Sequence, residues 1–154
     1  MYDAPGQEYI GDEPCALANA VDVIGERWSF FVLREALAGV TRFGEFRDRL
    51  GVATDVLTVR LQRLTDAGVL QRREYRQPGQ RARHEYVLTT AGNELAVIVV
   101  ALQQWGEVHA PSRTPSSIVA RGGDAQQIRA ALVDEHGQAV DVERVRFDRD
   151  SHPA

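Results

Sequence analysis

The sequence predicts a mainly α-helical domain that carries one small antiparallel β-hairpin. Three observations indicate this fold class. Apolar residues recur at helical spacing through most of residues 14–109, and glycines stand where the helical patterns end. In addition, two strand-like segments flank a Pro-Gly turn. The chain has 154 residues, a length that suits one such domain and a small appendage.

The first two helices are expected before residue 40. Pro14 can open a helix in its first turn, and Gly25 breaks the helical pattern. The apolar positions of this helix are Leu17, Val21 and Ile24. A second helix is expected over residues 26–38, with Gly39 as its C-terminal stop. The residues expected to share one of its faces are Trp28, Phe31, Val32, Glu35 and Ala36.

Two further helices are expected on either side of a tight turn at Gly51. Thr41 can cap a helix over residues 42–50. The next helix is expected to begin at Ala53 or Thr54 and to end at Gly68. Its buried stripe consists of Leu57, Leu61 and Leu64. Its opposite face presents Asp55, Thr58, Val59 and Gln62, flanked by Arg60 and Arg63.

A basic hairpin follows, with strands over residues 69–75 and 83–88 around Pro78-Gly79. It carries five arginines, namely Arg72, Arg73, Arg76, Arg81 and Arg83. Thr89 or Thr90 is then expected to cap a fifth helix that reaches about His109. The segment Leu95–Trp105 of this helix is apolar almost all round, so we expect a second subunit to cover part of it.

The ends of the chain are expected to lie outside the main domain at residues 14–109. Residues 1–13 read as a flexible acidic segment, and residues 110–117 as a linker. Strand-like runs over residues 128–134 and 138–147, around a turn at residues 135–137, predict a small β appendage within residues 118–147. Residues 148–154 are expected to form a frayed tail.

Charge is distributed unevenly along the chain. Residues 31–86 carry a net charge of +4, although the whole chain carries −4. Every basic side chain is an arginine, whose planar guanidinium pairs in a bidentate manner with phosphate or guanine. Arginines also occur on solvated helices and in GC-rich genomes, so the basic middle segment is suggestive only in combination with the fold.

The order of short helix, tight turn, second helix and basic hairpin is that of a winged helix-turn-helix. The second helix of such a pair fits the DNA major groove, where its exposed residues meet base edges. Thr58 and Gln62 can form hydrogen bonds there, and Val59 can meet a thymine methyl group. The hairpin arginines can reach the DNA backbone or the minor groove.

The chain resembles the HxlR-type transcriptional regulators over about residues 14–109. The matching segments are PCALANAVDVIGERWSFFVLREAL, RFGEFRDRL, VLTVRLQRLTDAGVLQRREY, HEYVLTTAGNEL and VVALQQWGEVH. This resemblance implies a homodimeric regulator that binds a double-stranded DNA operator, and we expect a repressor. It also implies dimerisation through the N-terminal helix and the helix that holds Leu95–Trp105. The implied interface residues are Leu17, Val21, Ile98, Leu102 and Trp105.

The resemblance also assigns DNA-contacting residues position by position. The base-reading candidates are Thr54, Asp55, Thr58, Val59 and Gln62. The phosphate or wing candidates are Arg42, Arg60, Arg63, Arg81 and Arg83. Asp55 can accept a hydrogen bond from a cytosine amine or simply be solvated at a helix N-terminus. Arg60 can equally form an intramolecular ion pair.

This chain departs from the family pattern at three places. The family usually has a basic residue where Asp55 stands, and often a serine where Ala53 stands. The hairpin is also about two residues longer than usual. These departures bear on the operator sequence and on the start of the recognition helix.

The single cysteine, Cys15, has two interpretations. A helix N-terminus favours the reactive thiolate, and in several members of the resembled family this cysteine senses oxidants or electrophiles. The acidic neighbours Asp12, Glu13 and Asp22 oppose thiolate formation. The alternative is a small residue packed at a dimer interface. Because no second cysteine exists, a disulfide would have to join two subunits or capture a small thiol.

The sequence contains no enzyme signature, and we expect neither a metal nor another cofactor. The four histidines are scattered, without metal-ligand spacing. We expect a cytoplasmic protein without a membrane association, because no apolar run approaches about 20 residues and the N-terminus lacks a signal pattern. Two alternatives stay open: a winged-helix protein-interaction module, and a regulator gated by a small molecule held between subunits or by the appendage.

Overall fold

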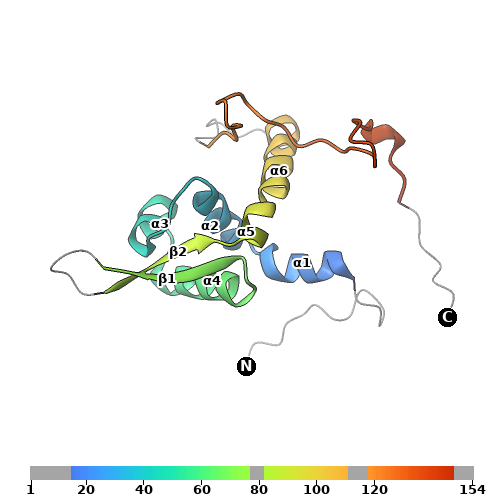
Figure 1. Cartoon of the computed structure of the whole chain (residues 1–154). Coiled ribbons are helices and arrows are strands. Elements are labelled where there is room, and N and C mark those ends of the chain that lie inside the picture. Colours follow the sequence, from blue (N-terminus) through green and yellow to red (C-terminus); the bar gives the residue numbers. More distant parts are fainter. Residues whose placement is uncertain (1–14, 77–81, 111–117, 148–154) are drawn as a thin grey trace. The chain divides into compact units, whose positions relative to one another are not determined.

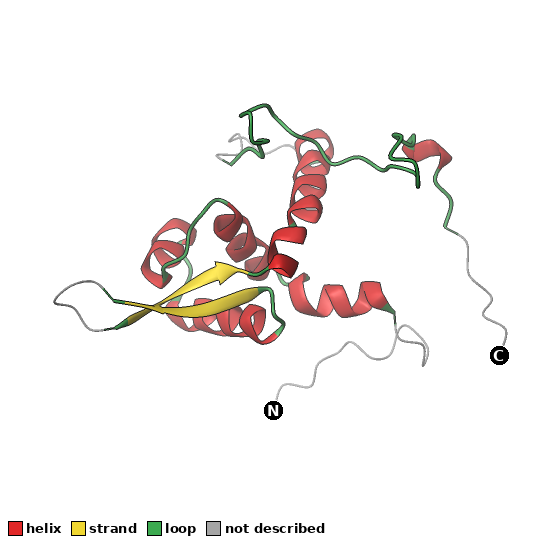
Figure 2. Ribbon diagram, in the orientation of Figure 1, coloured by secondary structure: helices red, strands yellow, loops and turns green. Residues whose placement is uncertain are grey.

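The computed structural model describes residues 15–76, 82–110 and 118–147 (Figure 1). It confirms the predicted fold class, since the described residues form mainly helices and one two-stranded antiparallel sheet (Figure 2). The elements are α1 (Ala16–Ile24), α2 (Arg27–Leu37), α3 (Phe43–Leu50), α4 (Thr54–Asp66), β1 (Leu70–Tyr75), β2 (Arg83–Leu88), α5 (Thr90–Glu94), α6 (Ala96–His109) and the short 3-10 helix η1 (Val142–Arg144). The chain forms two compact units, residues 1–99 and 100–154.

The core of the first unit lies between α2, α3, α4 and the sheet. The predicted stripe of α4 is confirmed, because Leu57, Leu61 and Leu64 are completely buried. Phe46 of α3 and Leu33 of α2 are buried with them in the same cluster. In the fold, α4 lies along β1, whereas α2 and α3 contact β2 (Figure 1). The buried stripe therefore fixes which face of α4 is left to solvent.

The turn between α3 and α4 begins at Gly51. This residue has a φ of +59°, in the left-handed region that glycine adopts without a steric penalty. The predicted stop at Gly51 is thus confirmed, and those at Gly39 and Gly68 also have positive φ values. Together these glycines set the lengths of α2, α3 and α4.

The predicted capping role of Thr41 is wrong. Arg42 occupies the N-cap position of α3 and makes no side-chain capping bond. The Thr41 hydroxyl instead donates to Oε2 of Glu85 at 3.3 Å, and its carbonyl accepts from the Tyr86 amide at 2.7 Å. Residues 41 and 42 are therefore drawn into pairing with β2, which a local sequence pattern could not reveal.

The hairpin is antiparallel, with pairs running from Leu70↔Leu88 to Tyr75↔Arg83. An isolated bridge between Arg42 and Glu85 adds the segment before α3 to the edge of β2. The predicted strands are confirmed to within one residue. The hairpin tip at residues 77–81, which includes Arg81, lies outside the described residues.

The predicted fifth helix forms as two segments. Thr89 caps α5 as expected, because its side-chain oxygen accepts from the Gly92 amide at 3.1 Å. The helix is interrupted at Leu95, which begins the connection to α6. Leu95 and Val99 both pack against the core. Tertiary packing of these two side chains accounts for a break that the continuous apolar pattern did not predict.

In the second unit, residues 118–147 contain isolated β bridges rather than regular strands. The predicted turn at residues 135–137 is present, since Val133 and Ala139 form an antiparallel bridge around it and Gly137 has a φ of +77°. A second bridge, Arg121↔Gln127, was not expected from the sequence. The runs at residues 128–134 and 138–147 do not form the longer strands that their composition suggested. No helix within the described residues is long and apolar enough to span a membrane.

Candidate nucleic-acid interface

The outer face of α4 is a row of exposed side chains that comes from one helix. Thr54, Asp55, Thr58, Val59 and Gln62 are all exposed, so the structure brings the five predicted base-reading residues together on one surface. This surface exists because the leucine stripe buries the opposite side of the helix. The face offers hydroxyl, amide, carboxylate and apolar groups, which are the groups that read base edges.

Two of these side chains also bind within α4. The Thr58 hydroxyl donates to the Thr54 carbonyl at 2.7 Å, which leaves its oxygen free to accept a hydrogen bond. Nε2 of Gln62 donates to Oδ1 of Asp66 at 2.7 Å. Since Gln62 and Asp66 are both exposed, this contact can exchange for a base edge at small cost.

Glu26, which directly precedes α2, links the start of α2 to α4. Its carboxylate contacts Nη2 of Arg60 at 2.6 Å and Nη1 of Arg63 at 3.0 Å. Of the two interpretations of Arg60, the intramolecular ion pair is therefore present. The Arg60 side chain is only 17% exposed, and its Nε is buried without a hydrogen-bond partner among the described residues. Arginines three positions apart share a helix face, so a common partner for Arg60 and Arg63 could be anticipated, but its identity as Glu26 could not.

The basic residues of the hairpin and of α3 have different surroundings. The guanidinium of Arg42 lies 5.0 Å from the ring centroid of Tyr75, a cation–π geometry. Nη2 of Arg72 donates to Nδ1 of His84 at 3.0 Å. Arg83 is exposed on β2. Within the described residues, Arg42, Arg72 and Arg83 form no ion pair with an acidic side chain, so their charges are available to an anionic partner.

Exposed apolar side chains occur on α1 and, separately, on α6. On α1, Leu17 is 71% exposed and Val21 is 53% exposed. On α6, Leu102 is 52% and Trp105 is 59% exposed, and no residue of this helix is buried within the single chain. Ile98 is also exposed. Large apolar side chains exposed in this number mark interaction surfaces.

Cys15 is a free, partly exposed cysteine at the N-cap position of α1. It makes no side-chain capping bond, and its carbonyl accepts from the Asn19 amide at 3.1 Å. The thiol therefore forms no hydrogen bond that caps the helix. Among residues 15–76, 82–110 and 118–147, no group of three or more histidine, cysteine, aspartate or glutamate side chains could hold a metal ion.

Comparison with known proteins identifies relatives of this arrangement. A model of the HxlR-like helix-turn-helix family matches residues 23–114. The HTH-type transcriptional regulator Rv3095 of Mycobacterium tuberculosis is 40% identical over 96 residues, which are 62% of this chain and 60% of that relative. The chain thus matches less than two thirds of the length of this relative. The HTH-type transcriptional regulator YdeP of Bacillus subtilis is 33% identical over 66% of this chain and 80% of its own.

Solved structures show the same likeness. The structure of PA1607, described as a candidate transcription factor, has a TM-score of 0.75 at 33% identity and covers 90% of this chain and 97% of that one. The redox regulator HypR in its reduced form has a TM-score of 0.56 at 31% identity, covering 62% of this chain and 94% of that chain.

Proposed function

Because the chain belongs to the HxlR-like helix-turn-helix family, we propose that it is a transcriptional regulator that binds a DNA operator as a homodimer. The observation that carries this proposal is the divided surface of α4. One face of this helix is buried through three leucines, and the other exposes five side chains able to contact bases. Curated relatives named HTH-type transcriptional regulators support it.

The proposed complex places α4 of each subunit in the major groove of one half-site. Thr54, Asp55, Thr58, Val59 and Gln62 read bases, while Arg42 and Arg83 contact phosphates together with Arg81 of the hairpin tip. Arg60 and Arg63 act mainly through Glu26, by holding α4 in its orientation. Two-fold symmetry then requires an inverted repeat whose half-site centres lie roughly 34–36 Å apart. Occupation of such an operator represses transcription by excluding polymerase from the promoter.

The dimer is proposed to form through the exposed apolar residues of α1 and α6. Leu17 and Val21 supply one surface, and Ile98, Leu102 and Trp105 supply the other. Burial of these side chains removes apolar area from water, at about 25 cal/mol per Å². A second copy of the chain is the partner that the family relationship supports.

Replacing Gln62 with alanine tests base reading. We expect specific operator binding to weaken by about tenfold, because an amide that pairs with a base edge is lost, while binding to random DNA stays unchanged. The control is Gln127→Ala, which removes an exposed amide in the second unit. Fluorescence anisotropy with both DNAs provides the measurement. If Gln62→Ala and Gln127→Ala changed operator binding equally, the protein-interaction module would be favoured. The exposed carboxylate of Asp55, which repels phosphate, is compatible with that alternative.

We further propose that oxidation of Cys15 weakens operator binding. HypR, a structural neighbour, is described as a redox regulator, and Cys15 is free and partly exposed. The thiols of two subunits would form one disulfide and pass two electrons and two protons to the oxidant. We expect the thiol oxidant diamide to lower operator affinity by about tenfold, and Cys15→Ser to abolish this response. A full response in the Cys15→Ser protein would assign Cys15 a packing role only.

A further inference from the structure

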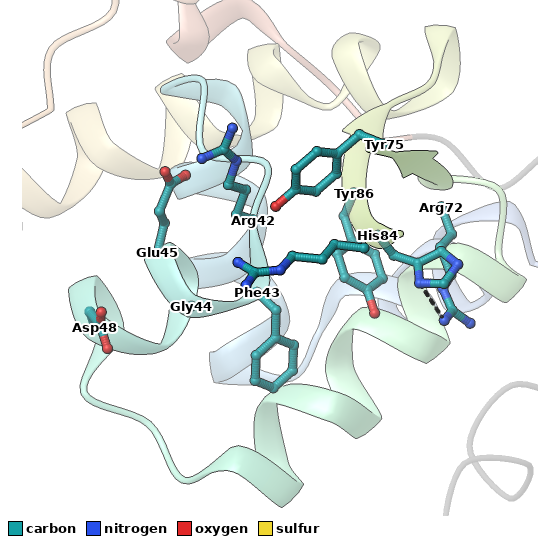
Figure 3. Close-up of a pocket in the computed structure, with 10 residues that line it drawn as sticks. Arg42, Phe43, Gly44, Glu45, Asp48, Arg72, Tyr75, His84 and Tyr86 are labelled. Carbon is teal, nitrogen blue, oxygen red and sulfur yellow. Dashed lines mark hydrogen bonds between the residues drawn. The ribbon is translucent and has the colours of Figure 1, made fainter. Parts of the chain in front are cut away.

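A groove of about 600 Å³ lies between α3 and the hairpin, entirely within the first unit (Figure 3). The groove is largely open to solvent, so a ligand there would lie on a shallow surface rather than in an enclosed cavity. No residue of α4 lines it, so the groove is separate from the base-reading face. Figure 3 shows that α3 contributes Glu45 and Asp48, whereas the hairpin contributes Arg72, Tyr75, His84 and Tyr86.

The groove carries more positive than negative charge. Arg42, Arg72 and Arg83 line it, and none of them forms an ion pair with an acidic side chain among the described residues. Its two carboxylates belong to Glu45 and Asp48, and Asp48 is already paired with Arg47 at 2.9 Å. Three guanidinium groups and two carboxylates, one of them already paired outside the groove, leave the groove with net positive charge, which suits an anion.

Three aromatic residues, Phe43, Tyr75 and Tyr86, are among those that line the groove, and Phe43 and Tyr86 also pack against the core. The guanidinium of Arg42 lies 5.0 Å from the ring centroid of Tyr75, so one wall of the groove combines a positive charge with an aromatic ring (Figure 3). Guanidinium and phenol groups favour planar ligands, because each can present a flat face to a ring. A phosphate group would use the arginines but not the rings.

From this combination we propose that the groove binds a small planar aromatic carboxylate that also carries a hydrogen-bond donor. Its carboxylate pairs with the arginines, its ring lies against the tyrosines, and its donor reaches Glu45. In the proposed complex the DNA backbone contacts Arg42 and Arg83, but it does not fill the groove, since Glu45 and Asp48 would repel a polyanion and a phosphodiester leaves most of the groove empty. This groove is a location for an effector in addition to the two expected from the sequence, between subunits or at the appendage.

Binding here would regulate the wing, an inference that rests on the proposed DNA-binding function. The ligand touches α3 on one side and β1 and β2 on the other. These parts are already linked by the Arg42↔Glu85 bridge and by the Tyr86 amide, which donates to the Thr41 carbonyl. A ligand between them fixes the direction of the hairpin relative to α3, and it occupies Arg42 and Arg83, which the proposed complex uses for phosphates. It should therefore reduce operator affinity.

The test is calorimetric titration of the full chain with 4-hydroxybenzoate, without DNA. We expect saturable binding that weakens by about tenfold or more in Arg72→Gln and in Tyr75→Leu, and with the neutral analogue 4-hydroxybenzamide. Arg73→Gln is the matched control, because Arg73 is the next residue on β1, has the same charge and does not line the groove. It should leave the affinity within about twofold of the parent protein.

Three results would overturn the proposal. One is no binding of 4-hydroxybenzoate at concentrations up to about 10 mM. Another is an equal loss of affinity in Arg73→Gln and Arg72→Gln. The third is inorganic phosphate binding as tightly as 4-hydroxybenzoate, which would make the groove a backbone-phosphate contact. The titration contains no DNA, so its result does not depend on the proposed function. A protein that binds 4-hydroxybenzoate but binds no DNA would contradict the proposed function and leave the ligand site intact.

Discussion

Replacing Leu102 with glutamate is expected to convert the dimer into monomers and to weaken operator binding by roughly 100-fold or more. Leu102 lies on the exposed apolar surface of α6. A carboxylate placed in a buried interface must be desolvated without a partner, which opposes association. A monomer binds only one half-site. In the dimer, binding of one recognition helix holds the second at a high effective concentration near the other half-site, and the monomer loses this advantage.

Analytical ultracentrifugation and fluorescence anisotropy would measure the two effects on one preparation. Val133→Glu is the matched control, because Val133 is an exposed valine at the bridge in residues 118–147 and lies on neither α1 nor α6. The control protein should stay dimeric and bind normally. A Leu102→Glu protein that sediments as a dimer would place the subunit interface elsewhere.

Replacing Leu61 with alanine is expected to lower the free energy of unfolding by about 2–5 kcal/mol. Leu61 is completely buried in α4 and belongs to the cluster that joins this helix to the rest of the core. The substitution removes apolar contacts and leaves a cavity that the surrounding side chains fill only in part. Urea denaturation at a fixed protein concentration provides the measurement, since the stability of a dimer depends on concentration.

Val59→Ala, on the exposed face of the same helix, is the comparison for Leu61→Ala. It should change the free energy of unfolding by no more than about 0.5 kcal/mol. It should instead lower the preference for thymine at one operator position by about fivefold. If Val59→Ala destabilised the protein as much as Leu61→Ala, the assignment of the two faces of α4 would be incorrect.

The features of the fold that the sequence revealed are those with a local cause. The leucines of α4 recur at helical spacing, so their burial could be predicted, as could the glycine stops with positive φ. Thr41 and Leu95 behave otherwise because distant residues decide their conformation. Thr41 pairs with a strand 44 positions away, and Leu95 packs against the core.

The candidate site divides in the same way. The outer face of α4 follows from one helical pattern, so its five exposed residues could be named in advance. The ion pairs of Glu26 could not, because Glu26 is separated from Arg63 by 37 positions. The groove likewise combines α3 with both strands of the hairpin. Only the tertiary structure brings Arg42, Tyr75 and Arg83 to one place.

The most direct test of the central claim is DNA binding by the purified protein across a salt series. The probe is the intergenic DNA beside its own gene, and random DNA of equal length is the control. We expect tight binding to the intergenic DNA, a clear preference over random DNA, and an affinity that falls steeply with salt because phosphate contacts release counterions. Weak binding that is equal on both DNAs, in reduced protein free of small ligands, would contradict it.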